Sequence, residues 1–441
     1  MGGIRNFLDK IKPAFSKNKY LHTTFDAIET FLFVPNEVTK RGVHIRDGMD
    51  LKRTMVFVVI AMQLCLLHGT INIGHQHYTM LGMYQGIFEG LGPKFIYGLL
   101  QLLPIIIVVH LVGLGIEFIF AAKNGHAVEE GFLVTGMLIP LIMPPAVPLW
   151  IVAVATAFAV VIAKEAFGGT GMNILNVALT ARVFIFFAYP TTISGEACWV
   201  SYDYNLLHQL VGLDNISQGF LATHGISLKE LVNAKGVFDP NLSPVVDGWS
   251  GATPLGLAAA GGWENVTNYA YQVNVDGAWE TIKPYSANNM LWGFIPGSIG
   301  EVNKPFAVVG ALMLIVTGIA SWRIMISMVI GLICMGSILT HFSGHFPANE
   351  FLAIPWWNHL LMGSFFFAMA FMATDPVTAA GTKTGKWIYG FSIGFLGLLI
   401  RVLNPAYPEG WMLAILFMNV FAPTIDHYIL QSNIKRRLVR G

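Results

Sequence analysis

The stretch DGWSGATPLG, residues 247–256, gathers side chains that could take part in covalent chemistry. Thr253 carries a hydroxyl, and Gly251 and Ala252 before it let the backbone enter another protein's cleft without a side-chain clash. No base adjoins Thr253 in the sequence, so an external enzyme must supply one to activate the hydroxyl. Ser250 offers a second hydroxyl upstream. The pattern predicts a flexible, exposed loop that another enzyme modifies.

Four acidic residues stand inside or at the ends of apolar runs, where an ionised side chain is costly and therefore a functional candidate: Glu117, Glu165, Asp375 and Asp426. Asp375 stands at a proline break, where freed backbone carbonyls can join its carboxylate as oxygen ligands for a desolvated cation. Asp426 has an alternative role, in which it faces water near Lys435. We expect Asp375 and Asp426 to be cation contacts, with Glu165 ranked third.

The run Gly168-Gly169-Thr170-Gly171 follows the fourth apolar segment. It is no nucleotide loop, because no Lys-Ser/Thr pair follows it. Either its small residues let a planar ring lie against the backbone, or they allow close helix packing. Thr170, Asn173 and Asn176 are weaker candidates for polar contacts with such a ring.

Two other polar residues have structural interpretations. Glu165 is expected to be interfacial and to pair with Lys164 or Arg182. His110, within the second apolar run, fits a hydrogen bond between helices better than a ligand role.

Several kinds of chemistry are excluded by missing motifs. The three cysteines are far apart and odd in number, which argues against a disulfide framework and against a Cys-x-x-Cys metal site. The chain also lacks a dinucleotide-binding fingerprint and a cysteine cluster for iron–sulfur centres. No metal site is expected beyond contacts to a transported ion, and no nucleic-acid partner.

Composition defines the class of protein. Hydrophobic residues make up 54% and charged residues 12%, whereas soluble domains are roughly a quarter charged. Runs of about 20 apolar residues are long enough to cross a bilayer as helices. The sequence predicts an all-α polytopic membrane protein with about ten spans, near 54–74, 96–122, 131–147, 148–164, 175–199, 305–321, 324–341, 357–374, 387–403 and 410–430.

The basic residues predict the orientation of the spans. Ten of the 26 Lys and Arg residues lie in the first 53 positions, and four more lie in the tail IKRRLVRG. Both ends are therefore expected in the cytoplasm, which requires an even number of spans. The long segment 200–304 carries four lysines against nine acidic residues, as expected of an external loop. The amino end is polar and basic, so no cleavable signal is expected.

These boundaries give five parts: a basic cytoplasmic arm (1–53), a first five-helix half (54–199), an external loop (200–304), a second five-helix half (305–430) and a basic cytoplasmic tail (431–441). Five spans on each side of the loop give the halves opposite topology. The stretches 138–148 and 371–381 both break at proline, which supports inverted repeats. The alternative is that both prolines mark ordinary span ends.

Asp247-Gly-Trp-Ser-Gly-Ala-Thr253 resembles the D-G-x-S-G-A-T motif recognised by bacterial flavin transferases. In families with this motif, the last threonine attacks FAD, releases AMP and keeps FMN as a phosphoester. Further segments extend the resemblance over nearly the whole chain, to the B subunit of the sodium-translocating NADH:quinone oxidoreductase: 164–176, 182–190, 373–390, 403–419 and 421–438.

The resemblance implies a respiratory complex of six subunits in the bacterial inner membrane. It implies two inverted five-helix halves like those of ammonium and urea transporters, FMN on Thr253, non-covalent riboflavin and an external flavin transferase. It also implies quinone or inhibitor binding at Gly168 and Gly169, and acidic residues on a sodium path at Asp375 and Asp426.

Two alternatives stay open. The D subunit of the Rnf ferredoxin:NAD complex shares the flavin-bearing motif but generally lacks so long a basic arm. A secondary transporter or channel built from inverted repeats would share the fold, although a passive channel has no use for FMN.

Overall fold

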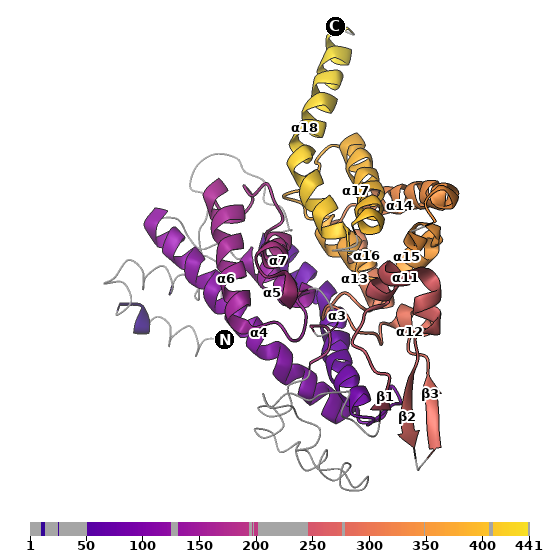
Figure 1. Ribbon diagram of the computed structural model, residues 1–441. Helices are drawn as coiled ribbons and strands as arrows, with labels where there is room; N and C mark the ends of the chain where they lie inside the picture. Colours follow the sequence, from indigo (N-terminus) through magenta and orange to yellow (C-terminus); the bar gives the residue numbers. More distant parts are fainter. Residues whose placement is uncertain are drawn as a thin grey trace.

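The computed structural model describes residues 10–13, 25, 51–124, 131–193, 196, 198–201, 246–275, 278–347, 349–404 and 409–439. The helices of the earlier and later parts of the chain form two neighbouring groups, with a small α/β unit beside the second (Figure 1). Most of the expected basic arm, and residues 202–245 of the expected loop, lie outside the described residues.

In the described part of the chain, the first group contains five α-helices, two of them long. They are α3 (Leu51–Met80), α4 (Leu91–Asn124), α5 (Phe132–Ile142), α6 (Leu149–Ala159) and α7 (Val177–Ala188). A π-helical turn, η1 (Val160–Lys164), and a 3₁₀ turn, η2 (Glu165–Phe167), continue α6. The short turn η3 (Pro190–Thr192) follows α7.

The second group has one strongly broken element. Its helices are α13 (Lys304–Val316), α14 (Trp322–Phe342), α15 (Trp356–Leu361), α16 (Phe365–Phe367), α17 (Lys383–Leu403) and α18 (Trp411–Leu438). The π-helical turn η7 (Ala368–Met372) continues α16, and the 3₁₀ turns η5 (Ser343–His345) and η6 (Glu350–Ala353) join α14 to α15.

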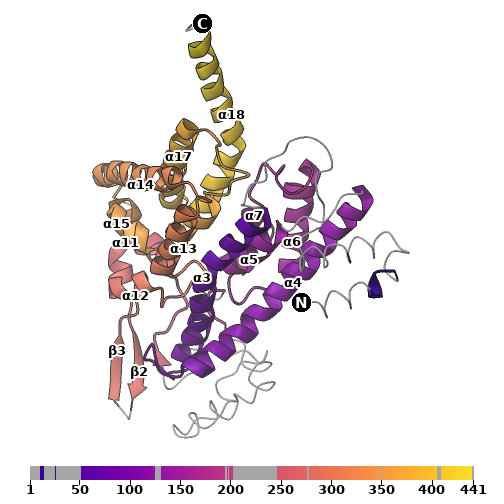
Figure 2. The same ribbon diagram turned by 180° about the vertical axis from the view of Figure 1, so that it is seen from behind.

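Between the groups, the chain forms a three-stranded antiparallel sheet in the order β1-β2-β3. Its elements are β1 (Val246–Asp247), α11 (Pro254–Asn268), β2 (Tyr271–Val275), β3 (Ala278–Ile282) and α12 (Ala287–Trp292). Val246 pairs with Val273, and Tyr271 pairs with Ile282. The hairpin of β2 and β3 and the C-terminal end of α18 lie at opposite ends of the molecule, which the reverse view also shows (Figure 2).

Six helices are long and apolar enough to cross a membrane, among the residues that the structure describes: Thr54–Met80, Leu91–Lys123, Leu149–Phe167, Trp322–His345, Lys383–Leu403 and Trp411–Leu438. Three further apolar helices are shorter, namely Phe132–Ile142, Val177–Ala188 and Lys304–Val316. Each of the ten ranges expected as spans contains helix, but the fifth is helical mainly over Val177–Ala188, and the eighth is divided among α15, α16 and η7. The mostly helical, multi-pass membrane class is therefore confirmed.

Glycines bring the backbones of long helices into contact. A Cβ atom at Gly98 of α4 would lie 1.7 Å from the carbonyl oxygen of Thr70 in α3. In the second group, a Cβ at Gly394 of α17 would lie 1.9 Å from the carbonyl oxygen of Met328 in α14. Small residues at such crossings permit the close backbone packing that holds helices together in lipid.

Candidate functional site

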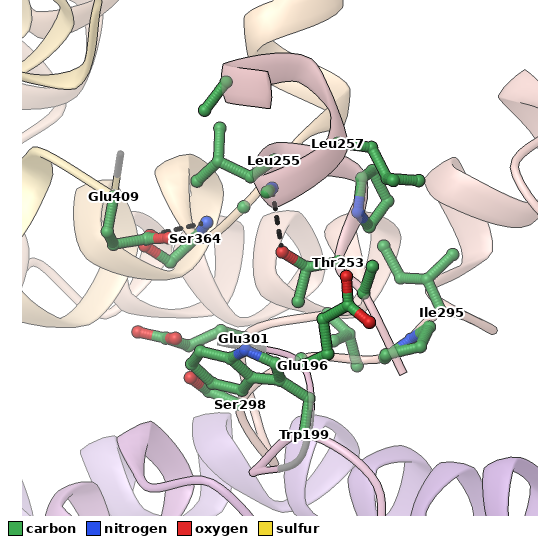
Figure 3. A pocket seen from close by; sticks show the side chains of 18 of the residues that line it. Glu196, Trp199, Thr253, Leu255, Leu257, Ile295, Ser298, Glu301, Ser364 and Glu409 are labelled. Atoms are coloured by element: carbon green, nitrogen blue, oxygen red, sulfur yellow. Dashed lines mark hydrogen bonds between the residues drawn. The ribbon is translucent and has the colours of Figure 1, made fainter. Parts of the chain in front are cut away.

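Thr253 is the N-cap residue of α11 and borders a cavity of about 280 Å³. Its Oγ1 accepts a hydrogen bond from the amide of Gly256 at 3.1 Å, which satisfies one of the free amides at the start of the helix. The hydroxyl lies among side chains that come from several parts of the chain (Figure 3). Thr253 itself is half-buried, so its oxygen is reachable from the cavity.

Two tyrosines bind the backbone at Ser250 and at Ala252, which flank Gly251. The Tyr269 hydroxyl accepts a hydrogen bond from the Ser250 amide at 2.6 Å and donates one to the Ser250 carbonyl at 2.8 Å. The Tyr285 hydroxyl donates to the Ala252 carbonyl. The two rings stack, with their centroids 5.2 Å apart. Burial raises the pKa of Tyr269, so its hydroxyl stays protonated and able to donate.

A third aromatic contact anchors the start of the motif. Trp249 is buried against Tyr271, with ring centroids 4.9 Å apart in an edge-to-face arrangement. Gly248 before it has a φ of +72°, which favours glycine. Gly251 and Ala252 are buried. Our expectation of a flexible, exposed loop was therefore wrong for most of the motif, because long-range aromatic and hydrogen-bond contacts order it.

An ion pair lies in the wall of the cavity. Arg182 of α7 contacts Glu301 at 3.1 Å, and both side chains are buried. The same Arg182 nitrogen donates to the Ser298 hydroxyl at 2.9 Å and to the Ile142 carbonyl at the end of α5. The pair thus connects the broken helix α5 with the segment before α13.

Other polar groups of the wall have partners of their own. Glu409 accepts hydrogen bonds from the Ser364 amide, at 3.0 Å, and from the Ser364 hydroxyl. Glu196 accepts one from the Ser250 hydroxyl at 2.7 Å. Lys304, the first residue of α13, is buried and donates to the Val302 carbonyl at 2.8 Å.

The cavity combines these polar groups with apolar walls. The apolar part comes from Leu255, Leu257, Ile295, Pro296 and Val302, among others. Sites for small molecules typically measure roughly 300–1,000 Å³ and pair apolar walls with a few polar groups. The volume is close to the lower end of that range, and the lining suits a flat, partly polar molecule.

A second cavity, of about 100 Å³, collects several residues predicted from the sequence. Lys164, Thr170, Asn173, Asn176 and Asp375 all line it. The Thr170 hydroxyl is buried and has no hydrogen-bond partner among the described residues. The structure therefore brings together the weaker polar candidates and one acidic candidate, although they come from different halves of the chain.

Asp375 is already engaged in local hydrogen bonds. Its carboxylate accepts from the Val377 amide at 3.1 Å and from the Thr378 hydroxyl at 3.0 Å. Asn176, the N-cap of α7, donates to the other half's Asp375 at 3.5 Å and accepts from the Leu179 amide. This carboxylate sits at the junction of the two helix groups.

Asp426 of α18 accepts hydrogen bonds from polar groups at the start of α17. Its carboxylate accepts from the Gly381 amide at 2.6 Å, from the Thr382 amide at 3.1 Å and from the Thr382 hydroxyl. Within the described parts of the chain, no group of three or more His, Cys, Asp or Glu side chains comes together to hold a metal ion. Asp375 and Asp426 thus lie at two separate places. Asp375 contacts Asn176 between the two helix groups, and Asp426 connects α18 to the start of α17.

The glycine pair Gly168 and Gly169 ends the α6 helix. Their amides bond to the carbonyls of Glu165 and Lys164, each at 3.1 Å, and their φ angles are +113° and +96°. A Cβ atom at Gly169 would meet no atom within 4 Å. Close helix packing therefore does not explain Gly169. The positive φ angle explains why glycine stands at this position, and the space beside Gly169 is open.

Two expected pairings were wrong. Lys164 forms a buried ion pair with Glu117, and Arg182 pairs with Glu301, so neither uses Glu165 as expected. His110 bonds through Nδ1 to the Ile106 carbonyl of its own helix at 2.8 Å, so this bond does not bridge helices.

Sequence reasoning missed the residues that surround Thr253. Tyr269, Tyr285, Arg182, Lys304 and Glu409 come from segments that no motif connects. One signal was available, since Glu301 and Lys304 are charges placed directly before a predicted span.

These features define a multi-pass membrane protein with broken helices and a folded, motif-bearing unit between its two helix groups. The family model described as "NQR2, RnfD, RnfE family" matches residues 38–435. The chain belongs to this family.

Proteins of three bacteria illustrate the similarity, and each is named as the B subunit of a Na(+)-translocating NADH-quinone reductase. The one from Ectopseudomonas mendocina (strain ymp) is 40% identical, with 100% of both chains covered. The one from Pseudomonas paraeruginosa (strain DSM 24068 / PA7) is 38% identical, also over 100% of both. The one from Chromohalobacter salexigens is 39% identical over 99% of this chain and 97% of its own.

Proposed function

We propose that the chain is the membrane subunit of a sodium-translocating NADH:quinone reductase and that it carries FMN on Thr253. The full-length similarity to proteins named as the B subunit of such an enzyme supports this proposal. These names favour the quinone-reducing complex over the Rnf complex, although the family includes both. The chain then works only with the other subunits of its complex, which deliver electrons from NADH.

The attachment is a phosphoryl transfer to a hydroxyl. Thr253 Oγ1 forms a bond to the flavin-side phosphorus of FAD, the phosphoanhydride bond to AMP breaks, and AMP leaves. The hydroxyl proton passes to a base of an external flavin transferase, because none of the described contacts of Thr253 is with a base. Tyr269 and Tyr285 hold the backbone that presents this oxygen.

The cavity beside Thr253 fits the attached group. FMN supplies an electron carrier when it is bound. The apolar side chains Leu255 and Ile295 suit the faces of its ring, whereas Ser298, Arg182 and Glu301 offer polar contacts at one side. Such a wall orients the ring and excludes water from it.

We assign quinone binding to the surroundings of Gly169 and the second cavity. The open space beside Gly169 and the unpartnered hydroxyl of Thr170 support this assignment. Asn173 and Asn176 offer amide donors to a carbonyl of quinone or of non-covalent riboflavin.

Asp375, Asp426 and Glu165 are our candidates for the sodium path. Asp375 is supported by its place between the two helix groups, at the mouth of a cavity. Asp426 joins α18 to the start of α17, so a cation that binds its carboxylate would compete with the amides of Gly381 and Thr382.

For topology, we propose ten membrane segments in two inverted halves, with both termini in the cytoplasm of a bacterial inner membrane. The broken α5 and the broken α15–α16 element support the inverted arrangement. The basic end of α18 lies opposite the β2–β3 hairpin, as a cytoplasmic tail and an external unit should (Figure 2).

The observation that carries the proposal is the Thr253 hydroxyl at the edge of a cavity of suitable size. Its test is the Thr253→Ala variant, made together with the flavin transferase. We expect the fluorescent flavin band of the denatured chain near 48 kDa to disappear, and the intact mass to lose an FMN-sized adduct. Thr267→Ala is the matched control, because Thr267 is an exposed threonine at the other end of α11 whose hydroxyl donates to the carbonyls of Trp263 and Glu264.

A wild-type chain without the adduct, or a Thr253→Ala chain that remains fluorescent, would reject the attachment. A dark wild-type chain would favour the alternative of a transporter without redox chemistry.

A further inference from the structure

Five ionisable side chains border the cavity beside Thr253: Arg182, Glu196, Glu301, Lys304 and Glu409. Four of them have partners already described. Arg182 pairs with Glu301, Glu196 accepts from Ser250, and Glu409 accepts from Ser364.

Lys304 differs from these groups. Its side chain is only 2% exposed, and its one hydrogen bond among the described residues goes to the Val302 carbonyl. Neither Glu301 nor Glu409 forms an ion pair with it within 4.0 Å in the described chain. Burial lowers the pKa of the Lys304 ammonium to about 7, and the carboxylates of Glu409 and Glu301 offset that effect only in part. An amine of this kind at the wall of a ligand cavity suits an electron-rich occupant, because negative charge nearby favours its protonated form.

We propose that Lys304 is the residue that faces the electron-accepting ring attached to Thr253 and raises its affinity for electrons. The inference rests on the proposed function, since it requires the flavin on Thr253. In this proposal, Lys304 acts on the ring through its charge. Arg182 contributes less to the electron affinity of the ring, because Glu301 neutralises it.

The physical reason is the sign of the charge. Reduction adds electrons to the ring and increases the negative charge on its carbonyl and nitrogen edge. A nearby ammonium stabilises that reduced form more than the oxidised form, and burial strengthens the interaction by excluding water. Removing the charge must therefore make the flavin harder to reduce.

The test compares three substitutions of Lys304 in the intact complex. Lys304→Met and Lys304→Gln remove the charge, and the Gln variant keeps a donor for the Val302 carbonyl. Lys304→Arg keeps the charge. Lys283→Met is the matched control, because Lys283 is an exposed lysine of the α/β unit and is not among the residues that line the cavity.

The readout is the midpoint potential of the Thr253-linked flavin, isolated by subtracting the spectroelectrochemical titration of the Thr253→Ala complex. We expect both neutral variants to weaken electron affinity by about tenfold, which is about 30 mV more negative for a two-electron couple. Lys304→Arg and Lys283→Met should keep the wild-type potential.

Three results would overturn the proposal. Neutral variants that carry flavin at the wild-type potential exclude an electrostatic role. Neutral variants that reach the membrane at wild-type level but carry no flavin indicate a role in attachment or folding instead. A shift of equal size in Lys304→Arg shows that shape, and not charge, matters. Failure of the proposed function is distinct, because the wild-type chain would then carry no flavin.

Discussion

The hydroxyl of Tyr269 is bound to both backbone polar groups of Ser250, 19 residues away in the chain: it accepts from the amide at 2.6 Å and donates to the carbonyl at 2.8 Å. One side chain therefore fixes the backbone three residues before Thr253. The threonine that we propose to be modified therefore follows a backbone segment held by a distant side chain, and substitution of Tyr269 tests what that contact contributes.

Tyr269→Phe should weaken the presentation of Thr253. It leaves an amide and a carbonyl without their partner, at a cost of about 1–3 kcal/mol for each group that water does not reach. We expect less covalent flavin per chain and a lower thermal midpoint. Tyr271→Phe is the control, because the Tyr271 hydroxyl contacts Gln85 at 3.3 Å and its ring contact with Trp249 is kept. Equal flavin loss in both variants would contradict a specific role of Tyr269.

Gly169→Val should raise the quinone KM or confer inhibitor resistance while the flavin content stays unchanged. The Cβ atom of a valine at Gly169 would meet no atom within 4 Å, so the side chain would enter the open space where we assign quinone. The positive φ adds strain of about 1–2 kcal/mol. Gly171→Val is the matched control, since Gly171 has a φ of +87° and equally open surroundings. If both variants change KM alike, backbone strain is the cause and the assignment fails.

Glu117→Gln should destabilise the first helix group strongly. It removes one partner of a buried pair and leaves the Lys164 ammonium uncompensated, which typically costs about 3–5 kcal/mol. The double variant Glu117→Gln/Lys164→Met should recover much of that loss, because no buried charge remains. Thermal unfolding in detergent measures both. A double variant no more stable than Glu117→Gln would show that the pair does more than balance charge.

Cys198 should be nearly inert towards thiolate-selective reagents at pH 7.5. Burial raises the pKa of its thiol from about 9 to about 12, although Arg182 and a backbone hydrogen bond act in the opposite direction. The folded state holds the proton more tightly than the unfolded state, so this group lowers stability only as pH rises above about 9. Labelling followed by mass spectrometry measures the reactivity. Rapid modification of the folded chain at pH 7.5 would contradict this burial.

Because Cys198 is expected not to react, cysteines introduced elsewhere can report the membrane orientation of the chain. Glu280→Cys places a thiol on the exposed strand β3. A membrane-impermeant maleimide should label it in intact spheroplasts, because we place this unit outside. A Cys introduced at Lys435, on the exposed end of α18, should react only after lysis. The reverse pattern would invert the topology and remove Thr253 from an external transferase.

The sequence alone determined the class of protein and supplied the motif from which we propose Thr253 as the modified residue. Apolar runs, the placement of Lys and Arg, and the seven-residue motif that ends at Thr253 are local properties, readable without knowing what packs against them. The membrane class followed because a bilayer requires continuous apolar helices. The interruptions near Pro144 and Pro376 were also visible, because proline removes a backbone donor and often ends or kinks a helix. Proline is not decisive by itself, since Pro104 and Pro423 stand inside α4 and α18.

Tertiary structure alone decided what surrounds Thr253. The Arg182–Glu301 pair joins residues 119 positions apart. Glu409, in the connection between α17 and α18, accepts from Ser364 at the start of α16. The same holds for Lys164, which pairs with Glu117 of α4 and not with its sequence neighbour Glu165. Which charges meet depends on how helices cross and which faces they bury, and these choices are made by packing across the whole chain. A local motif supplies the proposed nucleophile, whereas the cavity beside Thr253 exists only once distant segments fold together.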